Sequence, residues 1–115
     1  MTGGGMFAYV ANGAKKITVF RVAMETGALV KLQEIVVRGD DVAEGVREGR
    51  FTAIALSPDR RFLYASNRTA PYSVHTFAID GSSGLLTHLF EAPTVESTPF
   101  ISTDRTGRFL FGAHN

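Results

Sequence analysis

The side chains with the most chemical potential in this 115-residue sequence are an Asn-Arg-Thr tripeptide, three histidines and an acidic cluster. Arg68, within Asn67-Arg68-Thr69, is the strongest candidate for a functional role. Its guanidinium group keeps its charge and offers a fixed fork of donors. That fork suits a carboxylate, a phosphate or the oxyanion formed when a carbonyl is attacked. An arginine cannot exchange protons near neutral pH, so it is no general acid or base. The alternative interpretation is a surface arginine in a turn.

The histidines and serines form no recognisable catalytic or metal-binding motif. His75, His88 and His114 show no pair at metal-ligand spacing, which favours structural or solvent-exposed roles. Ser57 lacks the flanking glycines of a nucleophile elbow and belongs to a predicted turn. We therefore predict that the sequence contains no metal site.

The acidic cluster is the remaining candidate for ion binding. Asp40, Asp41, Glu44 and Glu48 could supply oxygen ligands to calcium, but a charged, solvated loop is the favoured interpretation. Residues 41–48 could alternatively form a short helix with its acidic residues on one face. The glycine-rich start precedes a strand instead of opening a phosphate-binding helix. We predict no cofactor.

Composition excludes several classes of protein. A hydrophobic content of 44% and a formal net charge of +1 argue against a disordered chain and against a nucleic-acid partner selected by bulk charge. The absence of cysteine excludes disulfides and thiolate metal sites. No stretch approaches the roughly 20 apolar residues of a membrane span, and the N-terminus has no signal-peptide pattern. We expect no membrane partner and a cytoplasmic location.

An internal repeat predicts the architecture that must position these side chains. Phe7-Ala8-Tyr9-Val10-Ala11-Asn12 returns as Phe62-Leu63-Tyr64-Ala65-Ser66-Asn67, and Phe109-Leu110-Phe111-Gly112-Ala113 begins a third copy. The repeat extends further, because residues 17–22 match residues 74–79 and Gly27-Ala28-Leu29 matches Gly84-Leu85-Leu86. Repeats of about 40 to 55 residues built from short strands are typical of β-propeller blades. The chain is therefore expected to be all-β and to be a piece of a larger propeller.

Alternating apolar residues and turn signals predict the individual strands. The first copy supplies three, and a polar connection then leads to a complete set of four. Ser57-Pro58-Asp59-Arg60 is the expected tight turn between the first two strands of that set, because proline presets φ and aspartate caps the following amides. The predicted strands span residues 6–11, 16–23, 29–37, 51–56, 61–66, 73–79, 86–92, 100–101 and 108–113. We expect an incomplete blade at 6–37, a complete blade at 51–92 and the start of another at 99–115.

These motifs resemble the seven-bladed propeller lactonase family. The resemblance rests on an aromatic-aliphatic-Tyr strand ending in Asn, a Gly-x-Leu turn, the hairpin at residues 57–64 and Asn67-Arg68-Thr69. It covers the chain from Met6 onward but only about a third of a family member, and it is closest to the later blades. The family includes propeller-type 6-phosphogluconolactonases and carboxymuconate cyclases. The resemblance implies a site at one mouth of the central channel, with Arg68 as a catalytic residue.

In such a fold, the connections between the second and third strands of a blade lie around that mouth. The residues expected to bind substrate there are Asn12, Asn67, Arg68, His114 and Asn115. The substrate implied by the resemblance is a small anionic lactone or a dicarboxylate.

Two departures from the family pattern weaken the catalytic interpretation. Where family members often carry a glutamate after the asparagine, this chain has Gly13, and where an arginine often follows proline, it has Thr98-Pro99. The histidine proposed for cyclase members would lie before Met1. We therefore expect this chain alone to be catalytically inactive.

Three functions remain open from the sequence. The favoured one is a fragment of a lactonase that hydrolyses a sugar-acid lactone. The second is a cycloisomerase that forms a lactone from an unsaturated dicarboxylate. The third is a propeller without catalytic activity, because one fold hosts many functions. The unpaired strand edges of incomplete blades also predict that the isolated chain self-associates.

Overall fold

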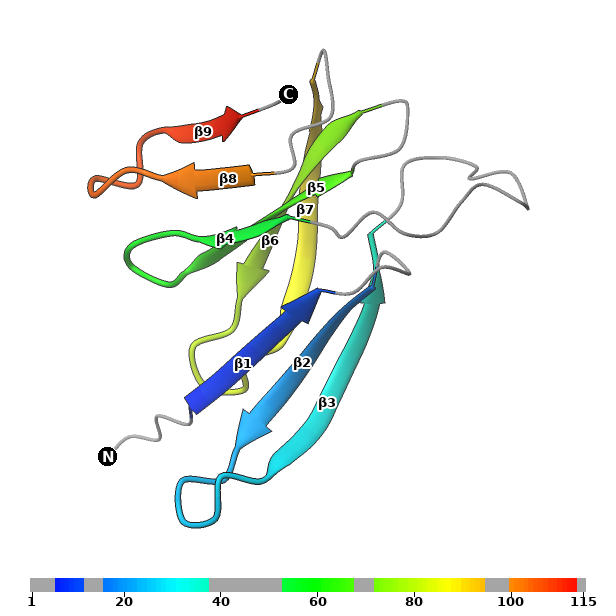
Figure 1. Ribbon diagram of the computed structural model, residues 1–115, viewed down its shortest axis with the longest axis vertical. Coiled ribbons are helices and arrows are strands. Elements are labelled where there is room, and N and C mark those ends of the chain that lie inside the picture. The colour runs from blue at the N-terminus through cyan, green and yellow to red at the C-terminus, as the bar shows by residue number, and fades with distance from the viewer. Residues whose placement is uncertain (1–5, 12–15, 38–52, 68–71, 95–99, 114–115) are drawn as a thin grey trace, which may run out of the picture.

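The computed structural model describes residues 6–11, 16–37, 53–67, 72–94 and 100–113 (Figure 1). These residues form antiparallel strands in three sheets and no helix, which confirms the all-β prediction. Consequently, no helix in the described part of the chain is long and apolar enough to cross a membrane. The acidic residues at 40–48 and the alternative helix predicted there lie outside the described residues. The strands are β1 (Met6–Ala11), β2 (Lys16–Val22), β3 (Leu29–Val36), β4 (Ile54–Leu56), β5 (Phe62–Asn67), β6 (Ser73–Ile79), β7 (Leu86–Pro93), β8 (Phe100–Thr103) and β9 (Leu110–Ala113).

Each sheet is a meander in which consecutive strands are neighbours. The first sheet has the order β1-β2-β3, the second β4-β5-β6-β7 and the third β8-β9. Within the described residues, the observed strands match the predicted ones to within a few residues at each end. The largest differences are in the third sheet, where β8 extends to Thr103, beyond its predicted end at residue 101, and β9 begins at Leu110 instead of residue 108.

The turns are held by side chains that accept backbone hydrogen bonds. In the β4–β5 turn, the Ser57 hydroxyl accepts the amide of Phe62 at 3.0 Å, and Asp59 Oδ1 accepts the amide of Arg61 at 3.0 Å. Asp104 plays a similar part in the β8–β9 turn, where its Oδ1 accepts the amide of Phe109 at 3.1 Å. The predicted capping role of aspartate at Asp59 is therefore confirmed.

A bulge recurs at the same place in the first and second sheets. The β2–β3 register shifts between Val19 and Phe20, and the β6–β7 register shifts between Thr76 and Phe77. Counted from the matching glycines Gly27 and Gly84, both bulges fall at the same position of the repeat. The structural repeat therefore includes the irregularity of the strands as well as their order.

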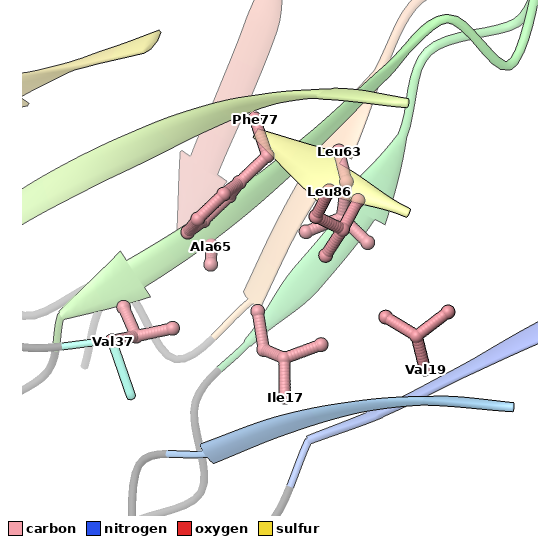
Figure 2. Close-up of a cluster of buried hydrophobic side chains, with 7 residues drawn as sticks. All are labelled: Ile17, Val19, Val37, Leu63, Ala65, Phe77 and Leu86. Carbon is pink, nitrogen blue, oxygen red and sulfur yellow. The ribbon is translucent and has the colours of Figure 1, made fainter. Parts of the chain in front are cut away.

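The core lies between the first and second sheets. In Figure 2, Ile17 and Val19 of β2 point toward the side chains of β5, β6 and β7, and Val37 lies at one end of the cluster. All seven side chains are almost completely buried. Those from β2 and β5 are alternate residues of their strands and therefore point to one face of the sheet. The buried apolar cluster consists of Ile17, Val19, Val37, Leu63, Ala65, Phe77 and Leu86.

Polar contacts also join the first two sheets. The Tyr9 hydroxyl donates to the carbonyl oxygen of Gly84 at 2.7 Å. The Gln33 amide accepts from the Leu86 amide at 2.8 Å and donates to the Leu86 carbonyl oxygen at 3.0 Å. The first sheet therefore contacts the tip of the β6–β7 hairpin through both apolar packing and hydrogen bonds.

Candidate functional site

The predicted site residues follow or close three equivalent strands of the repeat, β1, β5 and β9. Of the five predicted site residues, only Asn67 is among the described residues. The other four lie outside them: Asn12, Arg68, His114 and Asn115.

Asn67 is a buried residue at the end of β5, opposite Ser73. Its exposed fraction is 3%, and its interactions leave it partnered. It belongs to a group of buried polar side chains at this end of the second sheet. The members on β5 and β6 are Ser66, Asn67, Ser73, His75 and Thr76. Buried polar groups need hydrogen-bond partners, so this group constrains the end of the β5–β6 pair.

His75 is the titratable member of this polar group and contacts a second histidine. Its side chain is buried in β6, with Glu91 directly opposite on β7. His75 Nδ1 is 3.0 Å from Nε2 of His88, and His75 Nε2 is 3.3 Å from the Ser73 hydroxyl and 3.4 Å from Glu91 Oε2. We call His75, His88 and Glu91 the histidine cluster.

We assign the protons of the histidine cluster from the neighbours of His75. Glu91 can only accept a hydrogen bond and the Ser73 hydroxyl can either accept or donate, so the proton of neutral His75 is placed on Nε2. In this tautomer His75 Nδ1 accepts from His88 Nε2–H. Burial lowers the pKa of His75 below its ordinary 6.5, and His88 lowers it further, while the Glu91 carboxylate opposes both effects. His75 is therefore neutral at neutral pH.

The geometry of the two rings is that of a hydrogen bond and not of a metal site. The nitrogens are 3.0 Å apart and the ring centroids 5.2 Å apart. The difference of 2.2 Å is close to twice the centroid-to-nitrogen distance of an imidazole, so each ring points almost straight at the other. If the two rings shared a metal ion, their nitrogens would both point to an ion lying to one side of the line between the ring centroids. Nor do any three His, Asp or Glu side chains of the described residues come together in a way that could hold a metal ion.

Sequence reasoning missed this contact because 13 residues separate His75 from His88. The signal was present in the hairpin, since an antiparallel pairing brings such positions together. In the β6–β7 pairing, His88 lies opposite Phe77. Its contact with His75 is diagonal, and the pairing alone does not predict it.

Two hollows are lined by described residues of neighbouring sheets. One, of about 400 Å³, separates the second and third sheets and is lined by Tyr64, Thr76, Phe90 and Phe109, among others. Another, of about 920 Å³, lies beside β1 and the turn at Arg60 and Arg61. Among their described lining residues, neither includes Asn67.

Comparison with known proteins identifies the family. The family model described as "Lactonase, 7-bladed beta-propeller" matches residues 2–115. A 6-phosphogluconolactonase of Pectobacterium carotovorum is 34% identical over 110 residues, which cover 93% of this chain and 31% of that relative. A 6-phosphogluconolactonase of Enterobacter sp. is 43% identical over 68 residues, covering 58% and 20% respectively. The chain thus spans about a fifth to a third of the length of these relatives.

Solved structures agree in fold. The structure of a proposed 6-phosphogluconolactonase from Bacteroides uniformis superposes with a TM-score of 0.77 and 28% identity, over 93% of this chain and 29% of that one. Its counterpart from Bacteroides fragilis gives a TM-score of 0.75 and 27% identity, over 90% and 27%. With a family model that matches almost every residue and two solved structures that superpose over nine-tenths of it, the chain belongs to the seven-bladed β-propeller lactonase family.

Proposed function

We propose that this chain is part of a lactonase that hydrolyses a sugar-acid lactone. This is the activity expressed in the name 6-phosphogluconolactonase, which its relatives carry. The observation that carries the proposal is the match to those relatives over nearly the whole chain. We further propose that the three sheets are successive blades, at 6–37, 51–92 and 99–115. The expectations of a cytoplasmic location and of no nucleic-acid or membrane partner are part of the same proposal.

In the proposed mechanism, Arg68 binds the anionic group of the substrate or the oxyanion formed at the lactone carbonyl. Its position directly after Asn67 supports this role, because Asn67 is buried and β5 is fixed on both sides by β4 and β6. Asn12, His114 and Asn115 follow the ends of the equivalent strands and would bind the substrate at the same mouth. Arginine cannot activate the attacking water, so the general base must come from another part of the ring.

One observation favours a second candidate function. Gly13 and Pro99 stand where the family often has a glutamate and an arginine, so the acid or base and a second cation are missing. A propeller that binds ligands or partners without catalysis would have no need of either. A carboxymuconate-cyclase-like cycloisomerase is the other enzymatic alternative, and substrate tests distinguish it from the lactonase.

The test is an assay of the protein encoded by the complete reading frame around this chain. Lactone hydrolysis releases a proton and is followed with 6-phosphogluconolactone, in parallel with cyclisation of an unsaturated dicarboxylate. We expect hydrolysis, a loss of at least about 100-fold in kcat/KM in R68Q, as is typical for removing an oxyanion donor, and partial retention in R68K. R105Q, which changes an exposed arginine in the β8–β9 turn, is the matched control and should retain full activity.

Absence of both reactions in a folded protein would favour the non-catalytic scaffold. Cyclisation without hydrolysis would favour the cycloisomerase. Equal activity of R68Q and R105Q would exclude the role given to Arg68.

A further inference from the structure

The first sheet contains a permanent ion-pair cluster that corresponds to the histidine cluster of the second. Glu34 lies opposite Thr18 on β2. Its carboxylate accepts Lys31 at 2.6 Å and Lys16 at 3.0 Å. These two cations lower the pKa of Glu34, first through hydrogen bonds and then through charge. Because lysine and glutamate are both charged over the whole physiological range, this arrangement does not change with pH.

The repeat places histidines where the first sheet has these groups. Counted from Gly27 and Gly84, Glu34 corresponds to Glu91, Lys31 to His88 and Thr18 to His75. The pairing agrees, because Glu91 lies opposite His75 as Glu34 lies opposite Thr18. Both clusters also adjoin the recurrent bulge. The second sheet therefore keeps the carboxylate of the first but has histidines in place of Lys31 and Thr18, and the charge of a histidine side chain can change near physiological pH.

We propose that the histidine cluster is a proton-operated latch at the interface of the first and second sheets, closed at neutral pH and opened when His75 takes up a proton. The closed form is the hydrogen bond from His88 Nε2–H to His75 Nδ1. A proton taken up by His75 must bind Nδ1, which turns the acceptor into a donor and sets its new N–H group against the N–H group of His88 Nε2.

Opening reaches the core through Phe77. The His88 ring meets Phe77 edge-on, with centroids 5.2 Å apart, and His75 stacks on the same ring at 6.5 Å. Phe77 is only 1% exposed and belongs to the cluster between the sheets. Leu86, which Gln33 of the first sheet holds at both backbone groups, lies two residues before His88. Displacement of His88 toward solvent would uncover Phe77 and weaken the packing of β7 against the first sheet.

Few titratable groups face the histidine cluster from the strands packed around it. On its own hairpin, Ser73 and Glu91 are the polar groups beside His75. From β5, the residues on the same face are Leu63, Ala65 and Asn67, none of which titrates. Strand alternation puts Tyr9 and, at the far end of β2, Arg21 on the side of the first sheet that faces the cluster, while Lys16, Lys31 and Glu34 belong to its other side. Glu91 is thus the anion that would form an ion pair with a protonated His75.

The sign of the effect follows from the lowered pKa of His75. The closed form is fully stable above the ordinary value of 6.5 and loses stability as the pH falls below it, because the opened or unfolded chain takes up the proton first. Opening should become up to about tenfold more frequent for each pH unit below 6.5, until His75 is itself protonated in the folded protein.

The experiment uses the chain labelled with ¹⁵N-histidine, together with amide hydrogen exchange, between pH 7.5 and 4.5. We expect His75 to be the Nε2–H tautomer at pH 7.5, and exchange at Phe77 and His88 to accelerate by about tenfold per pH unit below 6.5, after correction for intrinsic exchange. The double variant H75T/H88K copies Thr18 and Lys31 of the first sheet and should show no such acceleration. H114Q, which changes the third histidine, should behave like the wild type.

The proposal is overturned if wild-type His75 is the Nδ1–H tautomer at neutral pH, or if exchange at Phe77 and His88 does not accelerate on acidification. It is also overturned if H75T/H88K retains the acceleration. The tautomer measurement needs no variant, so the proposal stays testable even if the double variant fails to fold.

Discussion

At the scale of single residues, Gly84 shows how a turn glycine can serve packing as well as conformation. Gly27 and Gly84 occupy equivalent hairpin turns and have the same left-handed φ of 74°. A Cβ on Gly27 would meet nothing within 4 Å, whereas a Cβ on Gly84 would overlap the ring of Phe7. The same tip of the β6–β7 hairpin receives the Tyr9 hydrogen bond. Gly84 therefore lets the first sheet approach the hairpin closely.

This difference predicts unequal effects of two matched substitutions. G27A should cost about 1 kcal/mol of the free energy of unfolding, because alanine is strained in the left-handed region. G84A carries the same strain and in addition overpacks the contact with Phe7, for a total of about 2–4 kcal/mol. Urea denaturation of both variants measures the two costs, and equal losses would show that the Phe7 contact relaxes freely.

Another residue-scale prediction concerns the acid sensitivity of the β6–β7 turn. Asp80 Oδ1 accepts the amides of Ser82 at 2.9 Å and Ser83 at 2.8 Å, and these bonds lower the pKa of Asp80 well below its ordinary 3.8. A lowered pKa in the folded state means that the stabilisation is complete above about pH 3.8 and is lost as the pH falls further. D80N should therefore flatten the dependence of the melting temperature on pH below 3.8.

The control for this measurement is E25Q in the β2–β3 turn. Glu25 takes part in none of the described hydrogen bonds. Its replacement should therefore leave unchanged the fall of the melting temperature at acid pH, which we call the acid limb. An acid limb as steep in D80N as in the wild type would assign the acid sensitivity to other groups. The turn carboxylates Asp59 and Asp104, whose pKa values are also lowered, are the next candidates.

At the scale of elements, Gln33 joins two sheets that share no strand. Its side-chain amide bonds both backbone groups of Leu86, at 2.8 and 3.0 Å, in the way that a neighbouring strand would. Leu86 is 4% exposed, so water could not easily hydrogen-bond its amide and carbonyl groups if the Gln33 side chain were removed. Removing one side of a buried hydrogen bond leaves the other unsatisfied, which generally costs about 1–3 kcal/mol.

We therefore expect Q33L to lower the free energy of unfolding by about 1–3 kcal/mol. L32Q is the matched control, because Leu32 is the unpaired bulge residue next to Gln33 and is partly exposed, and such surface changes stay within about 0.5 kcal/mol. Chemical denaturation of both variants compares them directly. A stability loss in L32Q as large as that in Q33L would point to the bulge itself, not to the amide.

The strands were predictable from the sequence because alternation and turn residues are local signals. Asn67, predicted to lie just outside a strand, instead closes β5, since its pairing with Ser73 depends on a partner strand that local pattern does not reveal. The recurrent bulges were not predicted for the same reason.

The candidate site was predictable only in part. The burial of Asn67 and the contact between His75 and His88 depend on register and on packing between sheets, neither of which alternation encodes. Arg68 was singled out by resemblance and by the chemistry of its side chain, and its role stays a prediction.

At the scale of the whole molecule, apolar surface gathers at the third sheet. Phe90 and Phe109 line the hollow between the second and third sheets, and both are more than half exposed. Phe100 and Phe111 of the β8–β9 hairpin are likewise exposed. In the described part of the chain, β1 and β9 each pair with a single strand. Unpaired edges and large apolar patches promote association between chains.

These features predict that the isolated chain self-associates. Its apparent mass in light scattering should rise with concentration, and its thermal unfolding should depend on concentration. F111K places a charge on β9 and should shift both measurements toward the monomer, because charges on edge strands oppose pairing between chains. M24K, at an exposed position in the β2–β3 turn far from this edge, should leave association unchanged. A sharp, monomeric melt that is independent of concentration would mean that the exposed phenylalanines and open edges are tolerated in solution, and that the chain needs no further strands to be stable.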